Sequence, residues 1–345
     1  MAANRKNTSM TRTISRDALA ALLLCSAAAL SVSCPGLAQD PVPAARPVAG
    51  APAAPLPSAE GFVGVEGGRV WYRIVGQGPG IPLLVLHGGP GIPSAYLEPL
   101  GELGRERPVV FYDQLGCGHS PAEDDPKLWT VPRFVDEVSR VREALGLRKV
   151  HILGHSWGAM VATDYMLTRP EGVTSLVLAG PCLSAPRWSE DTRKLLLTLP
   201  ASTRKIIVDH ESAGTTESPE YQEAVMEFYR LHVARRQPWA EYLTRALETM
   251  NPAIYGYMWG PSEFTPTGIL RTYDRTGRLG EIGVPTLVVS GQHDEILPET
   301  ALEYHRLIPG AELAIVPGAA HIAWHDDRDA FLAVVRGFLD RVETR

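Results

Sequence analysis

Short apolar runs alternate with amphipathic segments over most of the chain. Runs that are mostly apolar predict buried strands at Pro82–Leu86, Val109–Tyr112, Val150–Leu153, Val173–Ala179, Thr286–Ser290 and Glu312–Val316. Between the second and third of these, Phe134, Val138, Val141 and Leu145 recur at helical spacing. Buried strands that alternate with helices indicate an α/β fold in which a mostly parallel sheet is flanked by helices.

The segment 182–279 interrupts this alternation. It contains helical patterns at Tyr221–Arg235 and Pro238–Met250 but no buried strand pattern. Because it lies between two predicted strands of the sheet, we expect it to form an inserted helical cap. The core would then consist of residues 59–181 and 280–345, beginning with a hairpin that turns at Gly67-Gly68.

The N-terminus has the pattern of a secretory signal. Basic residues precede the apolar run Ala18–Val32, and small residues follow up to Ala38. We predict a signal peptide at residues 1–38 and export to the periplasm or medium, without stable membrane insertion after cleavage. A lipoprotein anchored through Cys34 is a weaker alternative, because Ser31-Val32-Ser33 is a poor lipobox. The Pro- and Ala-rich residues 39–58 predict a linker.

Composition narrows the function. With 345 residues, 45% hydrophobic and 21% charged, the chain is typical of a globular protein. A net charge of −6 without a basic patch argues against nucleic-acid binding. The four cysteines suit neither a disulfide scaffold nor a zinc site, so no zinc is expected. Cys117 and Cys182 are the cysteines of the predicted folded part, and whether they pair is left open, as is the oligomeric state.

The sequence Gly154-His155-Ser156-Trp157-Gly158 follows a predicted strand and opens a predicted helix. This is the setting of a nucleophile elbow, a sharp turn that exposes a serine hydroxyl above a sheet. A serine needs a base to remove its proton, and that base is usually a histidine oriented by a carboxylate. Asp294 and His321 each follow a later strand, in the expected chain order. We predict Ser156, Asp294 and His321 as a catalytic triad.

Neighbouring residues offer alternatives. Glu295 adjoins Asp294, but on a turn we expect it to point elsewhere. His293 and His325 are interpreted as polar surface residues, and His155 as a residue held beneath the elbow. Cys117 lacks a base placed by any motif and is not expected to be the nucleophile.

A glycine-rich loop, His87-Gly88-Gly89-Pro90-Gly91, follows the strand at Pro82–Leu86. Backbone amides in such a loop can stabilise the negative oxygen of a tetrahedral intermediate. We predict that the amides of Gly89 and Trp157 form this oxyanion hole.

Together with Asp113-Gln114-Leu115-Gly116-Cys117-Gly118-His119-Ser120 and the cap segment Met258–Phe264, these motifs resemble the proline iminopeptidase family of α/β-hydrolases. The resemblance extends from about Phe62 to Phe338. His119 and Ala320 depart from the residues common at those positions in the family, which bears on proline preference more than on hydrolysis.

The resemblance implies an aminopeptidase that releases an N-terminal residue, often proline, from short peptides without a metal or cofactor. It also implies acidic cap residues that hold the substrate's amine, with Glu263 first and either Glu220 or Glu227 second. A buried ammonium must be paired, or its desolvation costs several kcal/mol. The alternative is a related hydrolase of esters or amino-acid amides. A free-amine requirement separates the two.

Overall fold

The computed structural model describes residues 59–344. The predicted signal peptide and linker therefore lie outside the described residues. The described chain contains one eight-stranded sheet, whose strands are β1 (Ala59–Val65), β2 (Gly68–Val75), β3 (Leu83–Leu86), β4 (Val109–Tyr112), β5 (Val150–His155), β6 (Val173–Ala179), β7 (Thr286–Gly291) and β8 (Glu312–Val316). Each strand predicted from an apolar run is present.

The strand order is β1-β2-β4-β3-β5-β6-β7-β8. β1 pairs antiparallel with β2, and β2 with β4, while all other neighbouring pairs are parallel. The predicted mostly parallel sheet is confirmed. β5, which leads to Ser156, lies between β3 and β6, so the loops after β3, β5 and β7 open at the same edge.

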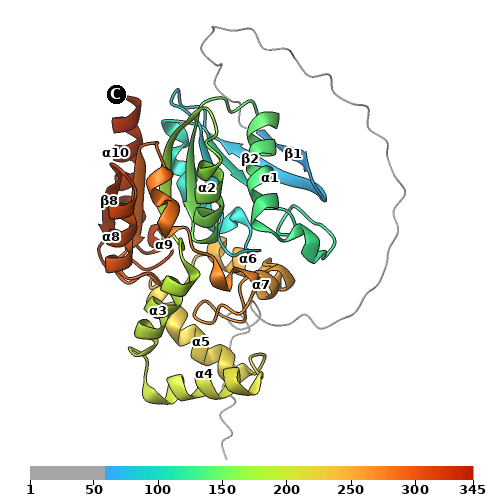
Figure 1. The fold of residues 1–345 in the computed structure, drawn as a ribbon, viewed down its shortest axis with the longest axis vertical. Coiled ribbons are helices and arrows are strands. Elements are labelled where there is room, and N and C mark those ends of the chain that lie inside the picture. Colours follow the sequence, from blue (N-terminus) through green and yellow to red (C-terminus); the bar gives the residue numbers. More distant parts are fainter. Residues whose placement is uncertain (1–58, 345) are drawn as a thin grey trace, which may run out of the picture.

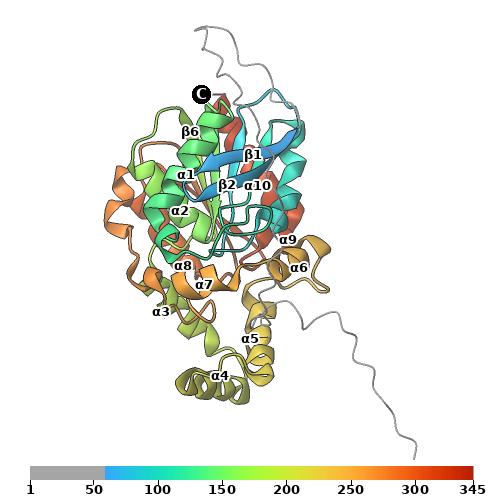
Figure 2. The same ribbon diagram turned by 90° about the vertical axis from the view of Figure 1, so that its right-hand side faces the viewer.

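Helices cover both faces of the sheet (Figures 1 and 2). One face carries α1 (Val131–Ala144), α2 (Trp157–Leu167) and α8 (Pro298–Leu307). The other carries the 3₁₀ segment η1 (Ser94–Arg105) and α10 (Arg328–Glu343), with Leu97, Leu100, Phe331 and Phe338 buried between them and the sheet. Within residues 59–344, no helix is both long and apolar enough to cross a membrane.

Five helices lie between β6 and β7, beyond the edge of the sheet where the motif loops gather (Figure 1). They are α3 (Ala185–Leu196), α4 (Ala201–Ala213), α5 (Pro219–His232), α6 (Glu241–Glu248) and α7 (Pro252–Met258), followed by the 3₁₀ segments η3 (Ile269–Thr272) and η4 (Thr276–Glu281). α4 packs on α5, and α6 packs on η1. α6 is shorter than the helix predicted at Pro238–Met250: it ends at Glu248, and Asn251 caps the next helix, α7, with its side chain.

Candidate active site

Ser156 occupies a sharp turn between β5 and α2. Its backbone angles are φ 54° and ψ −118°, a sparsely populated conformation for a residue with a side chain. Glycines on both sides make room for the turn. A Cβ on Gly154 would lie 2.4 Å from the carbonyl oxygen of Gly158, and one on Gly158 would lie 2.2 Å from that of Leu86. The spacing of the motif is therefore a steric requirement of the turn.

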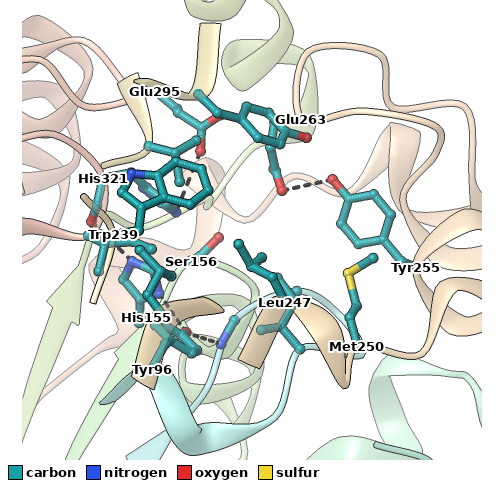
Figure 3. Close-up of a pocket in the computed structure, with 17 residues that line it drawn as sticks. Tyr96, His155, Ser156, Trp239, Leu247, Met250, Tyr255, Glu263, Glu295 and His321 are labelled. Atoms are coloured by element: carbon teal, nitrogen blue, oxygen red, sulfur yellow. Dashed lines mark hydrogen bonds and ion pairs between the residues drawn. The ribbon is translucent and has the colours of Figure 1, made fainter. Parts of the chain in front are cut away.

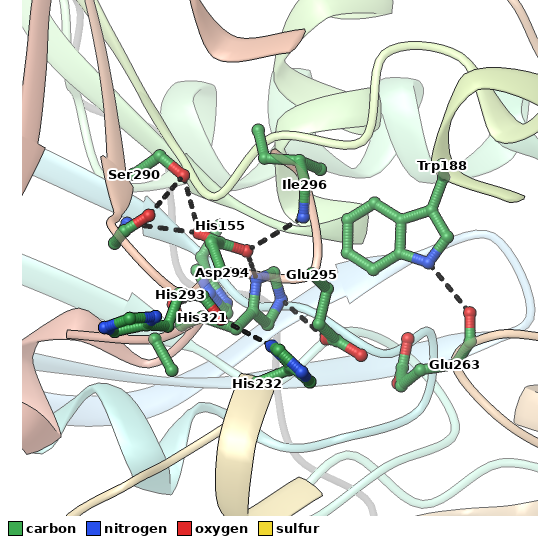
Figure 4. Close-up of polar contacts among 12 residues, drawn as sticks. His155, Trp188, His232, Glu263, Ser290, His293, Asp294, Glu295, Ile296 and His321 are labelled. Atoms are coloured by element: carbon green, nitrogen blue, oxygen red, sulfur yellow. Dashed lines mark hydrogen bonds and ion pairs between the residues drawn. The ribbon is translucent and has the colours of Figure 1, made fainter. Parts of the chain in front are cut away.

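Asp294 and His321 form a buried pair at the ends of β7 and β8 (Figure 4). His321 Nδ1 lies 2.7 Å from Asp294 Oδ1. The same carboxylate also accepts hydrogen bonds from Ser290 Oγ at 2.8 Å and from the amides of Gly291 and Ile296 at 3.3 Å. Asp294 is thus fixed in place, and it holds His321 with Nδ1 turned away from the cavity described next.

Two cavities meet at Ser156. The wide cavity, with about 50 Å³ open to water-sized molecules, is lined by Ser156, His321, both carboxyls discussed below and apolar side chains of the cap. The small cavity, about 10 Å³, is lined by Ser156, Trp157, Met160, Cys182 and Trp188, among others. Figure 3 shows the Ser156 hydroxyl pointing into the wide cavity. The structure therefore brings the predicted nucleophile and base to one opening.

His155, beside the nucleophile, connects three segments of the site. Its Nδ1 lies 2.8 Å from Tyr96 Oη, and its Nε2 lies 3.2 Å from the carbonyl oxygen of His321. Tyr96 Oη also accepts a 2.6 Å hydrogen bond from the amide of Gly88 (Figure 3). Burial lowers the pKa of His155 well below its ordinary value, so the ring stays neutral. These hydrogen bonds agree with the prediction that His155 is held beneath the elbow.

The amide of Gly88 is occupied by Tyr96, so the next amide of the loop, that of Gly89, is the better oxyanion donor. Gly89 adopts φ 112° and lines both cavities with Ser156. Trp157 is the first residue of α2, where backbone amides have no partner inside the helix. Both predicted donors thus lie next to the nucleophile.

Gln114, from the second motif, joins this loop to the elbow. The backbone amide of Gln114 donates to His87 Nε2 at 2.8 Å, and its side-chain Nε2 donates to the carbonyl oxygen of His87 at 3.0 Å. Its Oε1 accepts from Trp157 Nε1 at 2.8 Å. Next to it, Asp113 Oδ1 accepts from both the amide and the hydroxyl of Ser94. The motif that contains Gln114 therefore fixes the position of the glycine-rich loop at His87 relative to the elbow at Trp157.

The carboxyls of Glu263 and Glu295 line the wide cavity on the side opposite Ser156 (Figure 3). Glu263 accepts a 2.7 Å hydrogen bond from Tyr255 Oη. Glu295 is fully buried, and neither of its oxygens has a hydrogen-bond partner among residues 59–344. His321 Nε2 lies 3.8 Å from Glu295 Oε2, too far for a hydrogen bond. Burial raises the pKa of Glu263 and raises that of Glu295 well above 4.5, with the charges of Glu263 and Asp294 adding to the latter.

This arrangement corrects two expectations. Glu295 was expected to point elsewhere, but the turn after β7 directs it into the cavity beside Asp294. Glu220 and Glu227 do not reach the cavity: the Glu220 side chain is 66% exposed beside His210, and Glu227 accepts a hydrogen bond from Thr203 on α4. The reason is that α5 turns Tyr229, not its glutamates, toward the cavity. The sequence signal for Glu295 was its position directly after the acid.

The structure also places the cysteines and the other histidines considered above. Cys117 and Cys182 are both buried free thiols, and burial raises the pKa of each well above its ordinary value. Such thiols are poor nucleophiles.

His325, which was expected at the surface, is instead 4% exposed, and its ring forms hydrogen bonds with Tyr242 Oη and the carbonyl oxygen of Arg236. His293 is only partly exposed, in the turn beside Asp294. Across the part of the chain with described coordinates, no cluster of three or more His, Cys, Asp or Glu side chains could hold a metal ion.

Comparison with known proteins agrees with this geometry. The family model described as the α/β hydrolase fold matches residues 81–327. Proline iminopeptidase of Heyndrickxia coagulans is 42% identical over 285 residues, which cover 82% of this chain and 99% of that protein. The crystal structure of the Mycobacterium smegmatis proline iminopeptidase superposes with a TM-score of 0.77 at 35% identity, covering 83% of this chain and 99% of that one.

The chain belongs to the proline iminopeptidase family of α/β-hydrolases. A second solved structure, that of VinJ, is similar with a TM-score of 0.80 at 33% identity and the same coverage. Because nearly all of each solved chain is matched, the likeness includes the helices between β6 and β7 as well as the sheet. The predicted fold class and the resemblance to this family are both confirmed.

Proposed function

We propose that this protein is a serine aminopeptidase that releases an N-terminal residue, preferably proline, from short peptides. The observation that carries the proposal is the pair Glu263 and Glu295. A fully buried carboxyl without a partner is costly, and a second carboxyl beside it adds repulsion. A substrate ammonium placed between them would pair with both. The preference for proline rests on the names of the relatives and on the family to which the chain belongs.

The proposed reaction begins when the ammonium binds between the carboxyls and places the first peptide bond over Ser156. His321 Nε2 takes the hydroxyl proton as Ser156 Oγ attacks the carbonyl carbon, and Asp294 stabilises the imidazolium that forms. The amides of Gly89 and Trp157 hold the negative oxygen. His321 then gives its proton to the leaving amine, and an acyl-enzyme remains on Ser156.

Water completes the cycle. His321 removes a proton from the water as it attacks the acyl-enzyme, and returns it to Ser156 Oγ when the free amino acid departs. The amine of the bound residue stays between Glu263 and Glu295 throughout, because it is one atom removed from the reacting carbonyl. The carboxyl pair therefore selects the end of a chain, since an internal peptide nitrogen carries no charge.

A panel of chromogenic amides tests this function. Proline, alanine and leucine 4-nitroanilides are each assayed with a free and an acetylated amine. The proposal expects cleavage only of the free amines, with proline the best. Equal cleavage of acetylated substrates, or cleavage of simple esters in preference to any free aminoacyl amide, would contradict it and favour the related ester or amide hydrolase.

We also propose that the protein is exported, on the sequence pattern of residues 1–38 alone. Expression of the full chain, fractionation and N-terminal sequencing test this. Cleavage after Ala38 is expected. Retention of the intact N-terminus in the cytoplasm would contradict export, and lipid attached to Cys34 would favour the lipoprotein.

A further inference from the structure

The wide cavity contains much more apolar wall than the amine site needs. Beyond the two carboxyls it is lined mostly by aliphatic and aromatic side chains of the cap and of the loop after β3, which include Ile92, Val233, Trp239, Leu243, Leu247 and Met250. α6 supplies two of these and turns its charged residues, such as Arg245 and Glu248, outward. The proposed amine site accounts for Glu263 and Glu295 only, so these apolar side chains must contact another part of the substrate.

The chemistry of the triad decides which part of a substrate meets this wall. The leaving nitrogen must lie near His321 Nε2, since it receives its proton from that atom. His321 and Ile322 line the wide cavity and are not among the residues that line the small one. The leaving amine therefore departs through the wide cavity.

The acyl residue then belongs on the other side of Ser156. The small cavity is bounded by Met160, Cys182, Trp188, Trp259 and Leu270, which are side chains that an apolar ring of the acyl residue would contact. Glu263 lines both cavities, as expected for a group that holds the amine on the carbon between the ring and the reacting carbonyl. The two cavities thus divide the substrate at the scissile bond.

From this division we infer that the enzyme selects its substrates by an apolar, uncharged leaving group, and that Leu247 and Met250 of the cap determine this selectivity. The inference rests on the proposed function. Figure 3 shows both side chains on the side of the cavity away from Glu295. No Lys or Arg is present among the described residues that line the cavity, so a carboxylate on the second residue would be desolvated without a partner. Substrates with an apolar second residue and a blocked C-terminus fit best.

Four peptide amides measure this selectivity: Pro-Phe-NH₂, Pro-Leu-NH₂, Pro-Gly-NH₂ and Pro-Asp-NH₂. A side chain buried in an apolar pocket changes kcat/KM by about 10- to 200-fold per well-placed group. We expect Pro-Phe-NH₂ and Pro-Leu-NH₂ to exceed Pro-Gly-NH₂ by about tenfold or more. Pro-Asp-NH₂ should be the poorest, and Pro-Leu with a free carboxylate should be poorer than its amide.

The variant Leu247→Asn tests the assignment of the wall. Asn keeps a similar size but replaces the apolar end with an amide, and Leu247 is only partly buried, so folding should persist. It should reduce the Phe-to-Gly ratio of kcat/KM at least threefold, chiefly by lowering kcat/KM for Pro-Phe-NH₂. Glu248→Gln, on the exposed face of the same helix, is the matched control and should leave all ratios as in the wild type.

Three results overturn the inference. Equal kcat/KM for the four amides shows that the apolar side chains of the wide cavity do not select the leaving group, while the proposed aminopeptidase activity stands. A Leu247→Asn variant that changes the preference for the first residue, Pro against Leu, shows that the wide cavity takes the acyl group. Failure to cleave any free-amine substrate rejects the proposed function and this inference with it.

Discussion

The unpaired carboxyl of Glu295 gives the sharpest prediction for the Glu295→Gln variant. The change keeps the shape of the side chain and removes its charge. In the free protein this removes a buried group repelled by Glu263 and Asp294. In the substrate complex it removes one partner of the ammonium, a loss that for buried ion pairs costs about 3–5 kcal/mol. Gln can still accept one hydrogen bond, so we expect a loss of about 2–3 kcal/mol.

At 1.36 kcal/mol per factor of ten, this loss lowers kcat/KM for proline 4-nitroanilide by about 30- to 150-fold. The assay pairs this substrate with 4-nitrophenyl acetate, which has no amine. Hydrolysis of the ester should be unchanged or faster in the variant. Glu227→Gln is the matched control, because Glu227 is a cap glutamate that lies outside the cavity, and it should stay within twofold of the wild type on both substrates.

The reasoning is refuted if Glu295→Gln cleaves the aminoacyl amide within threefold of the wild-type rate. It is equally refuted if both substrates lose activity in parallel. A parallel loss would mean that Glu295 supports His321, whose Nε2 lies 3.8 Å away, and not the amine.

Three further predictions follow from the same contacts. Asp294→Asn should lower kcat by about 10³- to 10⁴-fold, because an amide can donate to Nδ1 of His321 and stabilise the wrong tautomer; steady-state kinetics and a melting curve close to that of the wild type would show this. Tyr96→Phe leaves Gly88 N and His155 Nδ1 unpaired, so it should destabilise the fold by about 1–3 kcal/mol and lower kcat more than it raises KM, measured by urea unfolding and kinetics. Glu295→Gln should raise Tm relative to the wild type increasingly as pH rises above about 4.5. The folded state holds the Glu295 proton that the unfolded chain releases, so wild-type stability falls with pH until the raised folded pKa is passed; a Tm difference independent of pH would count against this.

Much of the fold follows from local sequence patterns. Parallel strands buried on both faces must be apolar throughout, as at Val150–Leu153 and Val173–Ala179, so their positions are readable without a structure. The elbow is also local, since Gly154 and Gly158 are required by contacts within the turn and with the adjacent strand. Asp294 and His321 follow strands whose ends meet at one edge of the sheet, which makes their meeting predictable.

The amine site could not be derived in this way. Whether Glu295 points inward depends on the turn after β7, where Asp294 Oδ1 accepts from the amide of Ile296 and sets the direction of the residue between them. A fully buried, unpartnered glutamate also contradicts the general rule that charged side chains avoid the interior. In the cap, the face of α5 that meets the cavity depends on packing of Phe228 and Tyr229 against Phe264, residues far apart along the chain.

Covalent labelling tests the central claim most directly. A fluorophosphonate reacts with a serine whose proton is removed by a neighbouring base, and peptide mapping by mass spectrometry locates the adduct. The account predicts one adduct, on Ser156, with loss of all aminopeptidase activity, and no labelling of Ser156→Ala or after His321→Ala. An adduct on another residue, or full activity in Ser156→Ala, would contradict it.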